Sequence, residues 1–385
     1  MPTAKPKVTR PKPAKPYPDF PLFPHATRRW AKKIRGKLHY FGPWDNWQAA
    51  IEKYQDQRND LHAGRTPRGN SDELTVRDMC NRFMTAKEIQ RDAGDITPRT
   101  FADYLKTCKL IVDSFGKNRL VIDLATNDFE QLRKALSKTR NPNTLGNEIQ
   151  RIRVAFKYAY DAGLVENPIR FGPTFKRPAK RILRALRQKK GSRMFKAAEL
   201  REIIKEAAQP LKAMILLGIN CGFGNQDCGT LPESALNLKN GWVDYPRPKT
   251  AVERRCPLWP ETVKTIQVSL DTRPKAKLAE HTGLVFLTRY GQPWAKDTPD
   301  SPVTKEMRKL LDELELHRPG LGFYALRHTF ETIGSESRDQ VAVNHIMGHA
   351  DQTMAGVDRE RISDDRLRDV SDFVRNWLFP EESAE

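Results

Sequence analysis

One arginine and two histidines stand in two short phrases of the C-terminal half, LRHTF at residues 326–330 and MGH at residues 347–349. An arginine side chain keeps its positive charge at physiological pH and can bond two oxygens of one phosphate. A histidine side chain can accept or donate a proton near neutral pH. Taken singly, Arg327 would be an ion pair on a helix surface and His349 a contact at a helix C-terminus. Their joint occurrence at this spacing favours a functional site over two separate surface contacts.

A lysine stands in a third phrase, PKT at residues 248–250, between strand-like runs at 241–245 and 254–258. On such a hairpin Lys249 is either an ordinary exposed charge or a group that reaches a ligand. His345 and His349 have the i, i+4 spacing that can hold a metal ion, but no further ligands stand nearby in the sequence. We therefore predict no metal site.

The five cysteines are odd in number and lack the C-x-x-C spacing of a zinc knuckle. This pattern argues against a disulfide framework and favours reduced, mostly buried thiols.

The phrases YALRHTF (324–330) and MGH (347–349), with the hairpin around PKT, resemble the second and third catalytic boxes and the lysine hairpin of the tyrosine recombinase (phage integrase) family. The resemblance implies breakage and rejoining of double-stranded DNA without a metal or other cofactor. It implies that Arg327 and His349 hold the scissile phosphate, that Lys249 is the general acid, and that a tyrosine forms a 3′-phosphotyrosyl link. It also implies an arm-type DNA-binding domain, a core-binding domain and a catalytic domain, in that order.

Three positions depart from the family's pattern. Residues 221–227 (CGFGNQD) resemble the box that holds the first arginine, and Gly224 stands in that arginine's place. Tyr324 stands where the family usually has histidine, a replacement that is tolerated more readily. Asp358 stands where the nucleophilic tyrosine belongs, and this chain has no tyrosine after Tyr324. We therefore expect impaired strand cleavage, which an identical partner chain cannot rescue because it lacks the same residue.

Two alternatives stay open. The protein could be an active recombinase, with Asp358 as an unorthodox nucleophile or with its tyrosine replaced on purpose. Carboxylates do attack phosphorus in some phosphotransferases, normally with Mg²⁺ to offset the charge. It could also be a structural DNA-binding protein without a role in bringing two sites together.

The formal net charge of +19 is concentrated in two segments. Residues 1–40 hold eleven Lys and Arg against one acid, and residues 170–196 hold eleven against none, so the rest of the chain is close to neutral. Two solvated tails are the ordinary explanation of such runs, and an acidic membrane surface is a further partner class. Two separate runs favour duplex DNA, whose phosphates neutralise them. The residues expected to bind DNA are Arg28, Arg29, Lys32, Lys33, Arg35, Lys37, Lys176, Arg177, Lys180, Arg181, Arg184, Arg187, Lys189 and Lys190.

The pattern of the chain predicts a multidomain, mainly α protein with an α+β catalytic domain. Residues 1–25 read as a flexible basic arm, and residues 26–68 as a small sheet with one helix that begins at Asp45 or Asn46 and stops at Gly64. Residues 72–170 have the apolar spacing of four or five helices. Residues 171–193 read as a basic linker, and 194–385 as the catalytic domain, with a further strand-like run at 284–287.

Trp30, Tyr40, Phe41 and Trp44 lie among basic residues, and either face a DNA groove or form the core of the small N-terminal domain. The last apolar helical pattern, from Leu367 to Leu378, could pack on a neighbouring protomer, and a homo-oligomer, with a tetramer on DNA, is expected from the resemblance. No apolar stretch has the ~20 residues of a membrane helix and no signal peptide is visible. We therefore expect a cytoplasmic protein of bacterial type, associated with the nucleoid.

Overall fold

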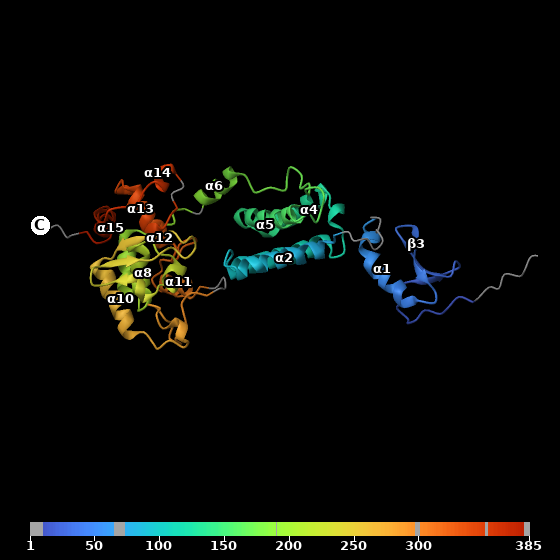
Figure 1. The fold of residues 1–385 in the computed structure, drawn as a ribbon, viewed down its shortest axis with the longest axis horizontal. Coiled ribbons are helices and arrows are strands. Elements are labelled where there is room, and N and C mark those ends of the chain that lie inside the picture. Colours follow the sequence, from blue (N-terminus) through green and yellow to red (C-terminus); the bar gives the residue numbers. More distant parts are fainter. Residues whose placement is uncertain (1–10, 65–73, 190, 297–300, 351–352, 381–385) are drawn as a thin grey trace, which may run out of the picture. The chain divides into compact units, whose positions relative to one another are not determined.

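The computed structural model describes residues 11–64, 74–189, 191–296, 301–350 and 353–380 of the 385-residue chain. The chain divides into two compact units, Met1–Leu183 and Arg184–Glu385, which are described separately (Figure 1). Among the described residues, no helix is long and apolar enough to cross a membrane.

The first unit begins with a small antiparallel sheet and one helix. Its elements are β1 (Phe23–His25), β2 (Arg29–Ile34), β3 (Lys37–Pro43) and α1 (Trp47–His62), with strand order β1-β2-β3. Arg35 and Gly36 form the β2–β3 turn with φ of 48° and 82°, the left-handed geometry of a tight hairpin. Asn46 caps α1, because its side chain accepts a hydrogen bond from the Ala49 amide at 3.0 Å. The predicted hairpin and helix are thus present, and β1 was not predicted.

The prediction of a flexible arm over residues 1–25 is wrong for its last part. Phe20 and Leu22 are each 1% exposed in the core of this small domain, and the Tyr17 ring packs edge-on against Phe20 and Trp47. Prolines do not prevent burial, and apolar side chains follow the last lysine of the arm. The core also contains Trp30 and Phe41, whereas Tyr40 is 37% exposed, so the interpretation of these aromatics as a core holds for the two buried rings.

A helical bundle follows. Its elements are α2 (Val76–Asp92), α3 (Pro98–Phe115), the short 3-10 helix η1 (Val121–Asp123), α4 (Thr126–Thr139) and α5 (Pro142–Asp161). Thr75, Thr97 and Asn141 cap three of these helices through their side chains. The four helices lie within the segment where apolar spacing predicted four or five.

The predicted linker 171–193 contains more structure than its composition indicates. Phe171 and Phe175 pack into the bundle core, and their ring centroids lie 4.9 and 5.3 Å from that of Phe129. Helix α6 (Lys180–Lys189) follows. The linker prediction is therefore wrong for these residues, because the buried Phe175 ring and the partly buried Phe171 ring outweigh the surrounding charge, and because Lys, Arg, Leu and Ala are good helix formers.

The second unit is mostly helical around one small sheet. Its helices are α7 (Ala197–Glu206), α8 (Leu211–Asn220), α9 (Asn225–Gly229), α10 (Pro260–Thr272), α11 (Pro302–Glu313), α12 (Ala325–Glu336), α13 (Gln340–Met347), α14 (Met354–Val357) and α15 (Asp364–Leu378), with 3-10 helices η2 (Glu233–Ala235) and η3 (Ala279–His281). Its strands are β4 (Leu236–Asn237), β5 (Trp242–Asp244) and β6 (Arg255–Pro257), antiparallel in the order β4-β5-β6. Strands β5 and β6 lie in the two predicted runs, whereas 284–287 forms only isolated bridges at Leu284 and Leu287. That prediction of a strand is wrong because no neighbouring strand pairs along the run.

The sheet and three helices are joined by buried polar contacts. The Asn220 side chain at the end of α8 donates to the Pro257 carbonyl and to Ser371 on α15, and accepts from the Trp259 amide, all within 3.0 Å. The apolar stripe of α15 is buried here too, with Leu367, Val370, Val374 and Leu378 at 0% exposure. These four residues serve the chain's own core, whereas Phe373 of the same pattern is 39% exposed and remains available to a neighbouring protomer.

Candidate functional site

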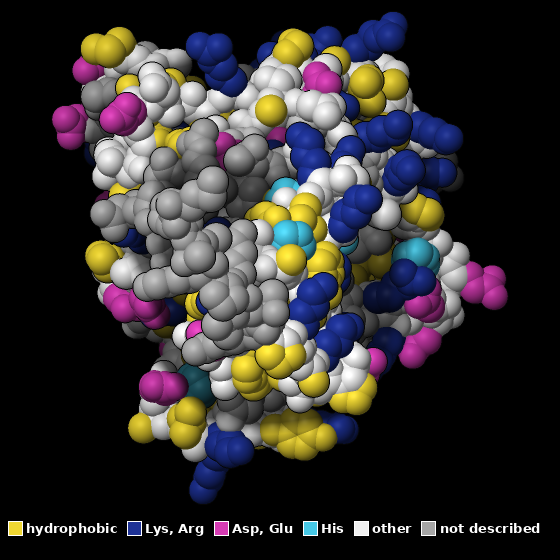
Figure 2. All heavy atoms as spheres, turned by 90° about the vertical axis from the view of Figure 1, so that its right-hand side faces the viewer, with side chains coloured by type: hydrophobic (Ala, Val, Ile, Leu, Met, Phe, Trp, Pro, Cys, Tyr) yellow, Lys and Arg dark blue, Asp and Glu magenta, His cyan; other side chains and the backbone are white. Residues whose placement is uncertain are grey.

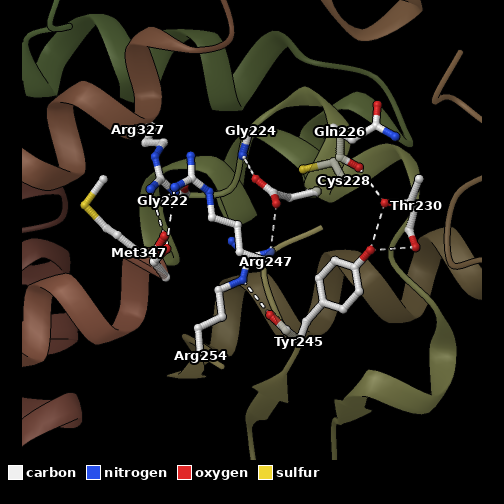
Figure 3. A network of polar contacts seen from close by, with 12 residues as sticks. Gly222, Gly224, Gln226, Cys228, Thr230, Tyr245, Arg247, Arg254, Arg327 and Met347 are labelled. Carbon is white, nitrogen blue, oxygen red and sulfur yellow. Dashed lines mark hydrogen bonds and ion pairs between the residues drawn. The ribbon is translucent and has the colours of Figure 1, made fainter. Parts of the chain in front are cut away.

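Arg327 and His349, which come from the two sequence phrases, lie in contact. Arg327 on α12 is 2% exposed. Its guanidinium donates to the Gly222 and Met347 carbonyls, each at 2.7 Å (Figure 3). It also lies 2.9 Å from Nε2 of His349. Because arginine only donates, Nε2 of His349 must accept, which puts the proton of the neutral ring on Nδ1.

His349 is placed by the end of α13. Gly348 ends that helix in the left-handed conformation, with φ 61° and ψ 44°, which suits glycine. Nδ1 of His349 faces Asn344 Oδ1 at 3.4 Å and Glu331 Oε2 at 3.8 Å. Burial lowers the pKa of His349, and the charge of Arg327 lowers it further. The imidazole is therefore held neutral beside a buried positive charge.

We expect the stability of the protein to fall as the pH drops below about 6.5, the usual pKa of histidine. Burial lowers the pKa values of His328, His345 and His349. Just below the usual pKa of histidine, the unfolded chain therefore binds more protons than the folded chain does. The free energy of unfolding therefore has its full value above the usual pKa and declines below it. Thermal unfolding at about pH 7.5 and about pH 5.5 measures the effect.

The triple variant His328→Asn, His345→Asn, His349→Asn is the control for this pH dependence. The melting temperature of the variant should drop less between these two pH values, because it lacks the three histidines that titrate in this range. Carboxylates titrate mainly at lower pH and contribute little to the difference. An equal drop in the variant and the unchanged chain would mean that the histidines are not its source.

Lys249 is not brought to this pair by any contact among the described residues. It lies exposed in the turn between β5 and β6, and its side chain has no hydrogen bond or ion pair within the described part of the chain. Its position leaves it free to move toward a ligand, which is one of the two possibilities that the sequence left open.

Gly224 and Tyr324 lie against one another. The Gly224 amide donates to Asp227 Oδ2 at 2.6 Å, and a Cβ at position 224 would lie 3.4 and 3.5 Å from two ring atoms of Tyr324. The Gly224 backbone is extended, with φ −96° and ψ −178°, which any residue can adopt. The nearest atom to such a Cβ is Asp227 Oδ2 at 3.2 Å, so position 224 could hold a side chain if the Asp227 carboxylate shifted slightly.

Asp358 is exposed just after α14. Its amide donates to the Met354 carbonyl at 3.0 Å. None of the contacts among the described residues joins its carboxylate to Arg327 or His349.

Two more arginines and an aspartate complete the surroundings, and the sequence did not single them out as site residues. Arg254 is 3% exposed; it pairs with Asp227 at 2.9 Å, donates to the Tyr245 carbonyl at 2.6 Å, and lies 4.1 Å above the Phe223 ring. Arg247 donates to the Gly348 carbonyl at 3.5 Å. The sequence signal for Arg254 was its place in the predicted strand-like run at 254–258. Its pairing with Asp227, 27 residues earlier in the chain, is visible only in the structure. Arg247 stands between two prolines and had no signal beyond its charge.

The predicted DNA-binding residues lie on two surfaces. Arg28, Arg29, Lys33, Arg35 and Lys37 are exposed on the N-terminal sheet, whereas Lys32 is half-buried, 4.6 Å above the Tyr54 ring. Lys176, Arg177 and the basic residues of α6, which are Lys180, Arg181, Arg184, Arg187 and Lys189, are also exposed. Lys190 lies outside the described residues. Lys and Arg side chains cover much of one side of the face seen in Figure 2.

Comparison with known proteins finds a family match and several similar structures. The model of the phage integrase family matches residues 185–357. The structure of a lambda integrase dimer bound to a COC′ core site is similar at 16% identity and a TM-score of 0.58, covering 91% of this chain and 98% of that one. A lambda integrase tetramer bound to a Holliday junction has 15% identity, a TM-score of 0.56, and coverage of 90% and 98%. The Tn1549 transposon integrase in complex with transposon right end DNA has 17% identity, a TM-score of 0.57, and coverage of 77% and 98%.

No curated protein matches the sequence. At the identities above, the structural likeness shows the fold. The predicted fold class, a mainly helical multidomain protein with a small N-terminal sheet domain and an α+β C-terminal domain, is confirmed.

Proposed function

Residues 185–357 belong to the phage integrase family, and from this premise we propose that the protein binds double-stranded DNA in site-specific recombination and integration, and is impaired in strand cleavage. The observation that carries the proposal is the buried Arg327–His349 pair, in a chain that has Asp358 where the nucleophilic tyrosine belongs. The pair gives a phosphate a place to bind, and Asp358 stands in place of the tyrosine that would attack it.

Charge supports DNA as the partner. Arg327 is bonded only to neutral groups among the described residues, so its charge is available to an anion. The exposed basic residues of the N-terminal sheet and of α6 would neutralise backbone phosphates. The similar lambda integrase structures hold DNA as a dimer and as a tetramer, which supports the same assemblies for this chain.

The chemistry of Asp358 supports impaired cleavage. A carboxylate near the scissile phosphate repels it, by about 1 kcal/mol at ~4 Å even in a dielectric like that of water. A tyrosine approaches the phosphate as a neutral hydroxyl and becomes charged only as the bond forms. The substitution therefore removes the nucleophile and adds a negative charge where charge must be neutralised.

The test is a binding series followed by a cleavage assay on the full chain. A duplex is selected by the protein from a random pool, and its affinity is measured against salt with and without unlabelled competitor. The same duplex with a nick beside each candidate position is then incubated with protein and run on a denaturing gel. We expect binding that weakens steeply with salt and no covalent band. Absence of binding would overturn the DNA proposal, and a covalent band would overturn the impaired cleavage.

A triple substitution on α6 should weaken DNA binding and reduce its salt dependence. Arg181→Gln, Arg184→Gln and Arg187→Gln remove three exposed charges. Each lost phosphate contact lowers the steepness of log affinity against log salt by about 0.9, or roughly 2.7 for three. Fluorescence anisotropy on the selected duplex at several salt concentrations measures this change.

The matched control removes the same charge from other helices, all of them in the second unit. Lys205→Gln, Lys264→Gln and Lys309→Gln lie exposed on α7, α10 and α11. If both triple variants lose equal steepness, binding depends on net charge alone and α6 is not a DNA-binding element.

A further inference from the structure

Arg247 is held rigidly in the loop that connects β5 to β6. Its amide donates to the Val252 carbonyl at 2.8 Å, and its carbonyl accepts from the Thr250 and Ala251 amides at 3.1 and 2.8 Å. Pro246 and Pro248 on either side restrict the backbone further. The start of the Arg247 side chain is therefore fixed by the hairpin.

The Arg247 side chain reaches the end of α13, where Arg327 also binds. Its Nη1 donates to the Gly348 carbonyl, next along the chain from the Met347 carbonyl that Arg327 contacts. The close approach depends on glycine, because a Cβ at position 348 would lie 3.0 Å from the Cβ of Arg247. Figure 3 shows the guanidinium groups of Arg247 and Arg327 side by side.

The two positive charges are not balanced by acids of the described chain. No carboxylate among the described residues forms an ion pair with Arg247 or Arg327, and Asp227, the acid beside them, is paired with Arg254. Burial lowers the pKa of Arg327, and the charge of Arg247 lowers it further. Two neighbouring guanidinium groups without a counter-charge make a site that favours an oxyanion.

We propose that Arg247 is a phosphate-binding residue of this site. Arg327 supplies one positive charge, and Arg247 supplies the second, in place of the arginine that is missing at position 224. The identification of the ligand as a phosphodiester of DNA rests on the proposed function. The two arginines come from the hairpin and from α12, so they can contact different oxygens of one phosphate while His349 stays between α13 and Arg327.

The test uses the full chain and inorganic phosphate, with sodium chloride added to keep the ionic strength constant. Hydrogen exchange is measured at the backbone amides of residues 340–350, which lie at the site. Phosphate that binds to the basic segments elsewhere in the chain does not contribute to this signal. Phosphate should protect these amides in the unchanged protein. In Arg247→Met the phosphate concentration for half-maximal protection should rise by at least about tenfold, as expected for loss of one charged hydrogen-bonding partner. Arg247→Lys should fall between the two.

Arg289→Met is the matched control, because Arg289 is exposed and lies on another loop of the same unit; it should keep the protection of the unchanged protein. Equal protection in Arg247→Met and the unchanged protein, or no protection in the unchanged protein, would overturn the assignment of Arg247. The proposed function fails separately, if the unchanged protein binds phosphate through Arg247 but binds no duplex in the salt series.

Discussion

Asp358→Tyr should turn a protein that forms no covalent complex with DNA into one that does. The change removes a negative charge and supplies the hydroxyl that can attack the phosphate held by Arg327. Asp358 is exposed, so the larger side chain should not disturb packing. Removing a covalent nucleophile costs roughly 10⁶-fold in rate in a serine protease, and restoring one should have an effect of comparable size. The measurement is the fraction of protein in a covalent band on the nicked duplex.

Asp358→Phe is the control, because it adds the same ring without the hydroxyl and should give no band. The double variant Asp358→Tyr, Gly224→Arg bears on Arg247 as well. If the single variant reacts, Arg247 suffices as the second charge. If only the double variant reacts, the arginine at position 224 is required and Arg247 does not replace it.

Phe129→Ala should destabilise the helical bundle by about 3–5 kcal/mol, the usual cost of removing a buried phenyl ring. Phe129 is 0% exposed, and its ring centroid lies 4.9 to 5.4 Å from those of four other phenylalanines. The cavity would loosen α4 from α5 and release the residues that follow α5. Hydrogen exchange of slowly exchanging amides in α2–α5 measures the free energy of opening in this unit alone.

Ile122→Ala is the comparison for this effect, because Ile122 is 51% exposed and its truncation should change stability by no more than about 0.5 kcal/mol. The prediction would be wrong if the free energy of opening were the same in Phe129→Ala and Ile122→Ala. In that case Phe171 and Phe175 would not depend on the Phe129 ring for their place in the core.

Local signals predicted much of the fold. The small sheet expected within residues 26–68 corresponds to β2 and β3, and the helix start at Asn46 is one of the two positions expected. Apolar spacing predicted the bundle helices because one face of each is buried. Residues 17–25 and 171–189 were misjudged because lysine and proline content says little about a few apolar rings among them.

The candidate site was predictable only in part. Arg327 and His349 belong to recognisable phrases, and the structure brings them to 2.9 Å. The place of Arg247 depends on a contact with Gly348 across 101 residues of chain, and no local pattern encodes such a contact. Lys249 shows the converse, because it stands in a recognisable phrase yet has no contact with the pair among the described residues.

The left-handed turn at Gly348 ties the folding of the C-terminal unit to the arrangement of its two neighbouring arginines. The carbonyls of Met347 and Gly348 accept from Arg327 and Arg247, and Arg247 stands in a tight hairpin that is part of the same unit. The exposed Asp358 takes part in none of these contacts within the described chain. Selection for a stably folded protein alone would therefore preserve the arrangement of the arginines, whichever residue stands at position 358.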